Sequence, residues 1–215
     1  SIPNSVTQIG NTAFYGCRGL TSASIPESIT SSGSYAIDGC ISLASVTLPK
    51  SLTTIGHQAF RECTSLNEVY FNADSCIIVG GAVYISPFEG AGQQCNLTIG
   101  NNVKSIPPHM FESFGGLSSV TIGDSLNSIG DCAFRYCDGL TSIQYLGDVK
   151  GWVSIDFADP YANPLWHAHH ISMNGSELTS LAIPNGVTEI KNHAFAGCTE
   201  IAELTIPSSV TIIGN

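Results

Sequence analysis

Hydrophobic and polar positions alternate in short runs along the chain. In the run that begins at Leu43, Val46 and Leu48 fall on one side of an extended chain, and Ser45 and Thr47 fall on the other. This alternation is typical of a half-buried β-strand. A proline at position 49 follows directly, and it cannot donate a hydrogen bond to a strand ladder. We therefore predict a short strand with Val46 and Leu48 inward, followed by a corner.

The residues after this corner predict a second, shorter extended side. Leu52 and Ile55 mark that side, and Gly56 turns the chain again. Residues 58–63 are too few for more than one helical turn, so the chain is expected to close into a coil there. The proline corner recurs in several units, as Pro3, Pro26, Pro49, Pro184 and Pro207.

The whole unit repeats with a period of 23 residues, the spacing from Phe14 to Ile37 and from Ile37 to Phe60. A fixed period of this size indicates a solenoid, in which each unit buries its apolar side against its neighbours. We predict a mostly β solenoid with a parallel sheet of about eight short strands and short helical turns. The outward strand positions would form two rows. One row contains Ser22, Ser45, Glu68, Asn96, Ser119, Ser142, Ser180 and Glu203, and the other contains Ser24, Thr47, Tyr70, Thr98, Thr121, Gln144, Ala182 and Thr205.

The period is interrupted twice. The spacing from Phe60 to Phe111 and from Phe134 to Phe195 exceeds two periods, which predicts insertions near residues 75–93 and 148–177. In the first, Ser86-Pro87-Phe88 is expected to take the place of the usual Ala-Phe pair. Residues 1–215 are expected to form a single repeat domain. Both of its ends fall inside repeats, so we expect the chain to be a fragment of a longer protein.

Two residue types recur at fixed slots and predict the core. Phenylalanines share one slot and should stack in successive coils, namely Phe14, Phe60, Phe111, Phe134 and Phe195. Cysteines share another slot, namely Cys17, Cys40, Cys63, Cys137 and Cys198. Neighbouring slots point in parallel, whereas a disulfide needs converging Cβ vectors about 3.5–4.5 Å apart. We expect these cysteines to be small buried apolar residues. A bridge between Cys76 and Cys95 is left open.

Composition narrows the kinds of partner. The formal net charge is −10, from 17 acidic and 7 basic residues, and no basic cluster is present. Nucleic acids and anionic membranes bind clustered Lys and Arg, so neither is an expected partner. No apolar run is long enough to span a bilayer, so we expect no membrane insertion of this segment.

Catalytic patterns are not found in the sequence, and it suggests no cofactor. The only candidate cluster is His167-Ala-His169-His170, in which His167 and His169 would share one face of a strand. Asp156 and Asp159 could approach this face as metal ligands. The alternative is that the histidines are surface positions of an insertion. We favour the second reading, and we expect neither a metal site nor an enzyme.

The repeat resembles the BspA-type leucine-rich repeats. The phrase I-P-x-S-V-T-x-I-G-x-x-A-F-x-x-C-x-x-L runs from Ile2 to Leu20, and its slots recur in 43–66 and, with Lys191 for Gly, in 178–201. The second insertion resembles a variant unit of that family, with Trp152 and Asn163-Pro164-Leu165 before an Asn-Gly turn. Members are typically secreted or surface proteins of mucosal and gut bacteria and of some protists. Several members act as adhesins for host extracellular proteins.

The resemblance and the motif-free, acidic chain together favour a non-enzymatic interaction module, secreted or at the cell surface. Its expected partner is an extracellular protein or glycan of a host or neighbouring microbe. The alternative is a structural scaffold of a larger cell-wall protein or enzyme. Exposed aromatic residues are common interface anchors, so Trp166 and Tyr70 are the predicted anchors. Trp166 could instead pack into a local core with Trp152 and Phe157. The remaining predicted binding residues lie in the outward rows, as Glu68, Thr98, Thr121 and Gln144.

Overall fold

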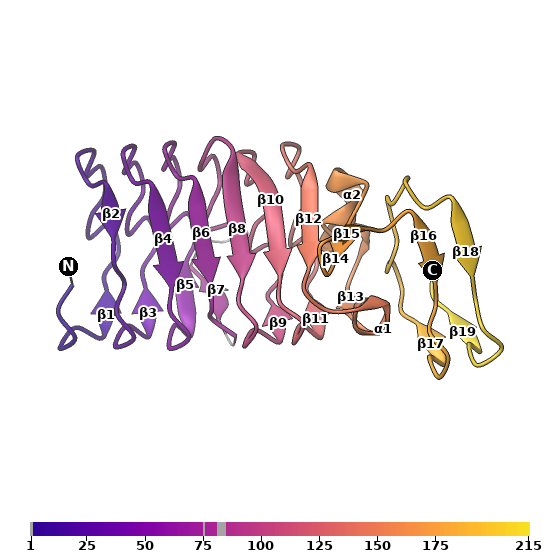
Figure 1. The fold of residues 1–215 in the computed structure, drawn as a ribbon. Coiled ribbons are helices and arrows are strands. Elements are labelled where there is room, and N and C mark those ends of the chain that lie inside the picture. Colours follow the sequence, from indigo (N-terminus) through magenta and orange to yellow (C-terminus); the bar gives the residue numbers. More distant parts are fainter. Residues whose placement is uncertain (1, 75, 81–84) are drawn as a thin grey trace.

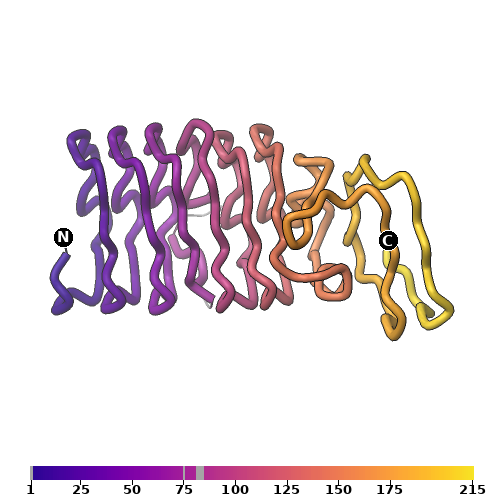
Figure 2. The backbone as a smooth tube through the Cα atoms, viewed as in Figure 1, coloured from indigo at the N-terminus to yellow at the C-terminus, as the bar shows by residue number. Residues whose placement is uncertain are grey.

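The chain winds into successive coils that stack side by side (Figure 1, Figure 2). The structure is a computed structural model that describes residues 2–74, 76–80 and 85–215. Each regular coil contributes one strand to each of two sides, and hydrogen-bonded turns close the third side. The predicted β solenoid is therefore confirmed.

The larger sheet contains eight strands in the order β15-β14-β12-β10-β8-β6-β4-β2. Their bounds are β2 (Ser22–Ala23), β4 (Ser45–Leu48), β6 (Glu68–Phe71), β8 (Cys95–Ile99), β10 (Leu117–Ile122), β12 (Ser142–Tyr145), β14 (Ser172–Met173) and β15 (Ser176–Glu177). Neighbours from β2 to β14 pair in parallel, and β15 turns back antiparallel to β14. In β4, Val46 and Leu48 are buried and Thr47 is exposed, as the alternation predicts. We call the outward side of this sheet the strand face.

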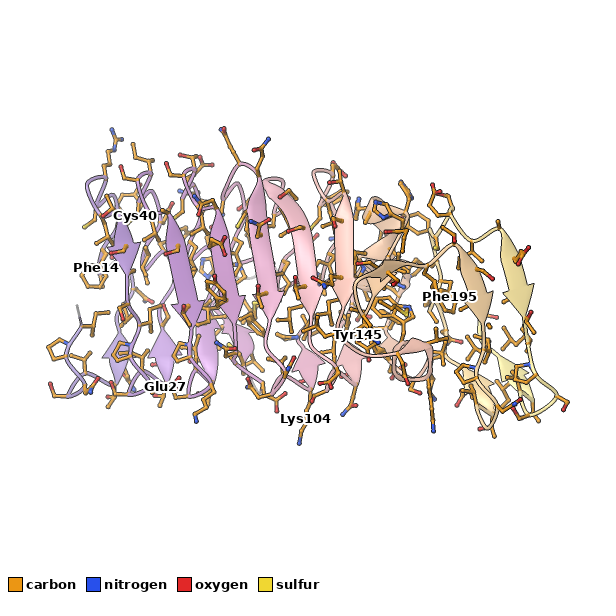
Figure 3. All side chains as sticks on the ribbon, viewed as in Figure 1. Phe14, Glu27, Cys40, Lys104, Tyr145 and Phe195 are labelled. Atoms are coloured by element: carbon orange, nitrogen blue, oxygen red, sulfur yellow. The ribbon has the colours of Figure 1, made fainter. Side chains whose placement is uncertain are left out.

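The second side is divided between two smaller sheets. The first contains β1 (Gln8–Ile9), β3 (Ser31–Ser32), β5 (Thr54–Gly56) and β7 (Ile77–Val79), and the next contains β9 (Ser105–Ile106), β11 (Ser128–Ile129) and β13 (Asp156–Phe157). Asp74 bridges the break between β7 and β9. Its carboxylate accepts hydrogen bonds from the backbone N–H groups of Lys104 and Ser105, and its carbonyl accepts one from Ser105 Oγ at 3.0 Å. The Lys104 side chain itself points away from the coils (Figure 3).

The first predicted insertion, 75–93, contains β7 and the turn around Phe88. Residues 75 and 81–84 of that insertion lie outside the described residues. Phe88 is fully buried and stacks on Phe60 with ring centroids 5.2 Å apart. The prediction that Ser86-Pro87-Phe88 replaces an Ala-Phe pair is therefore confirmed.

The second predicted insertion, 148–177, forms a modified coil. It contains α1 (Val149–Trp152), β13, the 3₁₀ helix η1 (Pro160–Ala162), α2 (Leu165–Ala168), β14 and β15. β13 pairs with β11 and β14 pairs with β12, so the segment extends both sides of the solenoid. The Phe134 N–H donates to the carbonyl of Tyr161 at 3.0 Å, which places Ala162 in the phenylalanine slot.

The last two coils form separate sheets. β16 (Ser180–Ala182) pairs with β18 (Glu203–Thr205), and β17 (Glu189–Ile190) pairs with β19 (Ile212–Ile213). The expectation that the strands at 180 and 203 continue the larger sheet is therefore wrong. The physical reason is that the β14–β15 hairpin occupies the edge of that sheet, so β16 pairs with β18 alone.

Stacked phenylalanines run through the middle of the molecule. Phe111 lies 5.8 Å from Phe88 and 5.4 Å from Phe134, measured between ring centroids, and all three rings are fully buried. Phe14 departs from the prediction because its side chain is 37% exposed and Ile37 occupies the slot in the next coil. Phe195 is partly buried against the core. The predicted column is thus continuous only from Phe60 to Phe134.

The cysteine slot has a recurring hydrogen bond. The thiols of Cys40, Cys63 and Cys137 donate to backbone carbonyls in the preceding coil, at 3.3, 3.2 and 3.1 Å. All eight cysteines are free thiols, including Cys76 and Cys95, between which a bridge had been left open. Burial is the main cause that raises the pKa of Cys63 to about 12. Cys40, Cys63 and Cys137 therefore act as small buried side chains that satisfy backbone carbonyls. The predicted burial is wrong for Cys17, which is exposed in the first coil, and only partly right for Cys198, which is half-buried.

Candidate functional site

The strand face belongs to the sheet with the most strands in the described part of the chain. Parallel pairing places Thr47, Tyr70, Thr98, Thr121 and Gln144 in register on five adjacent strands. All five side chains are exposed or half-buried, while the residues between them along each strand are buried. The structure therefore brings together four predicted site residues, Tyr70, Thr98, Thr121 and Gln144, in one row.

The second row contains the fifth predicted site residue, Glu68. It runs in register through Ser45, Glu68, Asn96 and Ser119. Ser119 Oγ donates to Asn96 Oδ1 at 2.6 Å, so hydroxyl and amide groups on neighbouring strands hold one another in place. Such cross-strand pairs give the face fixed donors and acceptors.

Glu68 and Tyr70 form a pair on β6. The two residues are two positions apart, so their side chains stand on the same face of the strand. The Tyr70 hydroxyl hydrogen-bonds to the Glu68 carboxylate, and this bond is the main cause that raises the pKa of Tyr70. The Tyr70 side chain remains 41% exposed, so the face combines an accessible aromatic ring with a carboxylate.

Trp166, the sixth predicted site residue, lies away from this row. It belongs to α2, and its ring meets that of Tyr161 edge-on with centroids 5.3 Å apart. Trp166 is 40% exposed and Tyr161 is 39% exposed. The strands β8, β10 and β12 lie between Tyr70 and the inserted coil. Trp166 and Tyr161 therefore form a second, separate aromatic surface.

The idea of a local core formed by both tryptophans is only partly right. Trp152 and Phe157 are buried with ring centroids 5.4 Å apart, and Trp152 also packs against Tyr145 at 5.2 Å. Leu165 and Ala168 are the buried residues of the short helix α2. Trp166 lies between them on the outward side of the same helical turn, so its ring remains outside this core.

The histidines do not share one face of a strand. His167 lies in α2, and His169 ends that helix with a left-handed backbone. The helix forms because Leu165 and Ala168 both face the core from a single turn. Burial lowers the pKa of His167, and the nearby Asp138 carboxylate partly opposes this shift.

The two aspartates considered as metal ligands have other positions. Asp159 caps η1 and accepts hydrogen bonds from the backbone N–H and the thiol of Cys132 at 3.1 and 3.2 Å. Asp156 is exposed at the start of β13. Among the residues that the structure describes, no group of three or more His, Cys, Asp or Glu side chains is placed to hold a metal ion.

Sequence reasoning missed the part played by Asn163. This fully buried residue donates from Nδ2 to the carbonyls of His193 and Ala194, at 2.8 and 3.1 Å. Its Oδ1 accepts from the Leu165 N–H at 3.0 Å. The only sequence signal was the Asn-Pro-Leu phrase, whose partners lie about 30 residues further along the chain. In the described ranges, no helix is long and apolar enough to cross a membrane.

A sequence family matches most of the chain. The family described as the BspA type leucine rich repeat region matches residues 1–86, 83–154 and 170–215, with six copies. No curated protein matches the sequence.

Several solved structures resemble the chain. A leucine rich repeat protein from T. pallidum is 26% identical over 97% of this chain and 67% of its own, with a TM-score of 0.41. A leucine rich cell surface protein from Faecalibacterium prausnitzii is 26% identical over 97% of this chain and 61% of its own, with a TM-score of 0.49. A leucine-rich repeat protein from Bacteroides ovatus is 18% identical over 97% of this chain and 78% of its own, with a TM-score of 0.28. The chain thus spans about two thirds of the length of the first two.

Proposed function

The chain belongs to the family of BspA-type leucine-rich repeat proteins, and from this premise we propose that it is a non-enzymatic interaction module. The module is secreted or displayed at the cell surface, where it acts as an adhesin. Its partner is an extracellular protein or glycan of a host or neighbouring microbe. Residues 1–215 act as one repeat domain in this proposal, in keeping with the single cluster formed by the buried apolar residues.

The observation that carries the proposal is the unbroken outward row of Tyr70, Thr98, Thr121 and Gln144. Four adjacent parallel strands hold these side chains on one regular surface. A specific interface needs about 800 Å² on each partner and a few anchors that supply most of the affinity. The strand face offers the area, with Tyr70 as its anchor. Trp166 is a candidate anchor on the second aromatic surface.

The chemistry of the cysteines supports a role other than nucleophilic catalysis. A reactive cysteine needs a low pKa, because the thiolate is the nucleophile. Burial instead raises the pKa values of Cys63, Cys76 and Cys95 to about 12. At neutral pH these thiols are therefore protonated and uncharged, as expected for side chains packed in an apolar core.

The proposal is tested by a binding screen against purified extracellular-matrix proteins and mucosal glycans. Wild-type protein is compared with Tyr70→Ala, Trp166→Ala and Thr121→Trp, after circular dichroism has shown an unchanged fold. Thr121→Trp places a bulky neutral group in the middle of the strand face. Ser128→Trp is its matched control, because Ser128 is a half-buried strand residue on the other side of the coil.

We expect at least one ligand whose affinity falls tenfold or more in Thr121→Trp and stays within twofold of wild type in Ser128→Trp. The proposal is overturned if no ligand in the panel binds, or if binding is equally sensitive to both substitutions. It is also overturned if the protein turns over a substrate and substitutions at His167 and His169 abolish that turnover.

A further inference from the structure

Two carboxylate–tyrosine groups among the described residues hold an arginine between them, and the Glu68–Tyr70 pair has no such cation. The Arg61 guanidinium lies 5.4 Å from the centre of the Tyr35 ring and forms a salt bridge of 2.9 Å with Asp38. A tyrosine and a carboxylate thus hold one arginine between them.

The second complete group follows the same plan at another coil. The Arg135 guanidinium lies 5.1 Å from the centre of the Tyr136 ring and pairs with Glu112. A cation over an aromatic face and a charge-assisted hydrogen bond to a carboxylate reinforce one another, because both interactions favour the same positive charge. Among the described residues, this combination of arginine, tyrosine and carboxylate occurs twice.

At β6 the aromatic ring and the carboxylate are present, and both belong to the strand face. Tyr70 is 41% exposed, and its hydroxyl hydrogen-bonds to the Glu68 carboxylate. In the part of the chain that the structure describes, no Lys or Arg pairs with Glu68. The register neighbours of the pair are uncharged, namely Ser45, Thr47, Asn96 and Thr98.

In the described rows of the strand face, no Lys or Arg side chain is present that could pair with Glu68 in place of a partner's cation. None of the described outward positions in either row is Lys or Arg. The strand face contains the carboxylates Glu68 and Glu177, and Glu203 occupies the corresponding slot on the separate β16–β18 sheet. Two of these three differ from Glu68. Glu177 pairs with His170 at 2.9 Å, and Glu203 has no aromatic residue two positions later, where Thr205 stands. Only Glu68 therefore combines an uncompensated charge with an exposed ring.

We propose that Glu68 and Tyr70 form a subsite for one cationic side chain of a partner protein, an arginine in the first instance. A guanidinium is flat, so it can stack on the Tyr70 ring while its N–H groups reach the Glu68 carboxylate. This inference rests on the proposed function and specifies the partner of the strand face as a protein segment with an exposed Arg or Lys. A neutral glycan would leave the Glu68 charge without a counter-ion.

The test uses three synthetic probes with the whole chain. The first probe is a twelve-residue peptide that alternates arginine with serine, and the second is the same peptide with citrulline, which has the shape of arginine without its charge. The third is a neutral mucin-type oligosaccharide. Dissociation constants are measured by calorimetry at two salt concentrations for wild type, Glu68→Gln, Tyr70→Leu, Tyr70→Phe and Glu203→Gln.

We expect the arginine peptide to bind at least tenfold more tightly than the citrulline peptide. Glu68→Gln and Tyr70→Leu should each weaken it at least fivefold, whereas Tyr70→Phe, which keeps the ring, should retain most of the affinity. Glu203→Gln removes a carboxylate from the same slot of another coil and should change the affinity less than twofold.

Three results would overturn the inference: equal binding of the two peptides, equal losses in Glu68→Gln and Glu203→Gln, or tighter binding of the oligosaccharide than of the arginine peptide. These results are distinct from failure of the proposed function. If a ligand from the screen is blocked by Thr121→Trp but is insensitive to Glu68→Gln, the strand face is an interface and the cation subsite is wrong. If neither substitution affects any ligand, both proposals fall.

Discussion

Two positions in each regular coil have a left-handed backbone. One follows the phenylalanine slot by two residues, and it is occupied by Gly16, Gly39, Glu62, Gly90, Ser113, Tyr136 and Gly197, with φ between 55° and 86°. The left-handed region costs a residue with a Cβ roughly 1–2 kcal/mol, whereas glycine adopts it readily. The coils that lack glycine here, such as the one with Ser113, are therefore locally strained.

Ser113→Gly is expected to stabilise the protein. The substitution removes the Cβ at φ 57° and should raise the free energy of unfolding by about 0.5–1 kcal/mol, after the larger unfolded-state entropy of glycine is deducted. The measurement is urea unfolding followed by circular dichroism.

Gly39→Ser is the matched control for this prediction. Gly39 has φ +70°, and a Cβ there would meet its nearest atom, the Gly16 Cα, at an ordinary 3.7 Å. Backbone strain is therefore the main change, and the free energy of unfolding should fall by about 1 kcal/mol. If both substitutions leave the stability unchanged, left-handed strain is not the reason that glycine recurs in this slot.

At the scale of elements, the inserted coil joins two sets of sheets, and no strand ladder connects these sets among the described residues. The Trp152 indole donates to the Ala194 carbonyl at 2.7 Å, and Asn163 Nδ2 donates to the carbonyls of His193 and Ala194. Two backbone hydrogen bonds also cross the junction, from Lys191 to Val153 at 3.0 Å and from Thr199 to His169 at 2.9 Å. Side chains therefore replace part of the missing ladder.

Asn163→Leu is expected to loosen the last two coils. The leucine keeps most of the volume but leaves the buried Leu165 N–H and two carbonyls with fewer partners, at a cost of about 2–3 kcal/mol. Hydrogen exchange measured by mass spectrometry should show faster exchange in residues 178–215 than in the wild type, with residues 43–71 little changed.

Trp152→Phe serves as the comparison, because it removes one hydrogen bond to the same carbonyl and keeps an aromatic ring. Its effect on residues 178–215 should have the same direction and a smaller size. Uniform acceleration across the chain in Asn163→Leu would show that Asn163 stabilises the whole fold and has no special part at this junction.

At the scale of the whole molecule, the stacking of coils makes an elongated body (Figure 2). In the described part of the chain, the coils from β2 to β18 each place a strand toward the same side. Parallel strands lie about 4.8 Å apart, so the body should be about 40 Å long. Each coil contacts its immediate neighbours, as expected for a quasi-one-dimensional fold.

Small-angle X-ray scattering should therefore give a pair-distance distribution with an early maximum and a long tail. The early maximum reflects the cross-section of one coil, and the tail reflects the stacked length. A symmetric, bell-shaped distribution, typical of a sphere, would contradict the stacked arrangement in solution.

The repeating parts of this structure could be predicted from the sequence alone. The 23-residue period determined which residues face inward, because each coil repeats the geometry of the last and contacts mainly its neighbours. The burial of Phe60, Phe111 and Phe134, the substitute role of Phe88 and the outward row through Tyr70 all follow from this regularity.

Only the tertiary structure decided what happens where the period is broken. The packing partners of Trp152 and the separate pairing of β16 depend on which surfaces meet after the inserted coil has folded. The hydrogen bond from Trp152 joins residues 42 positions apart, and those from Asn163 join residues 30 and 31 positions apart. Such contacts have no counterpart in the local alternation of apolar and polar residues, because that alternation records only which side of its own coil a residue faces.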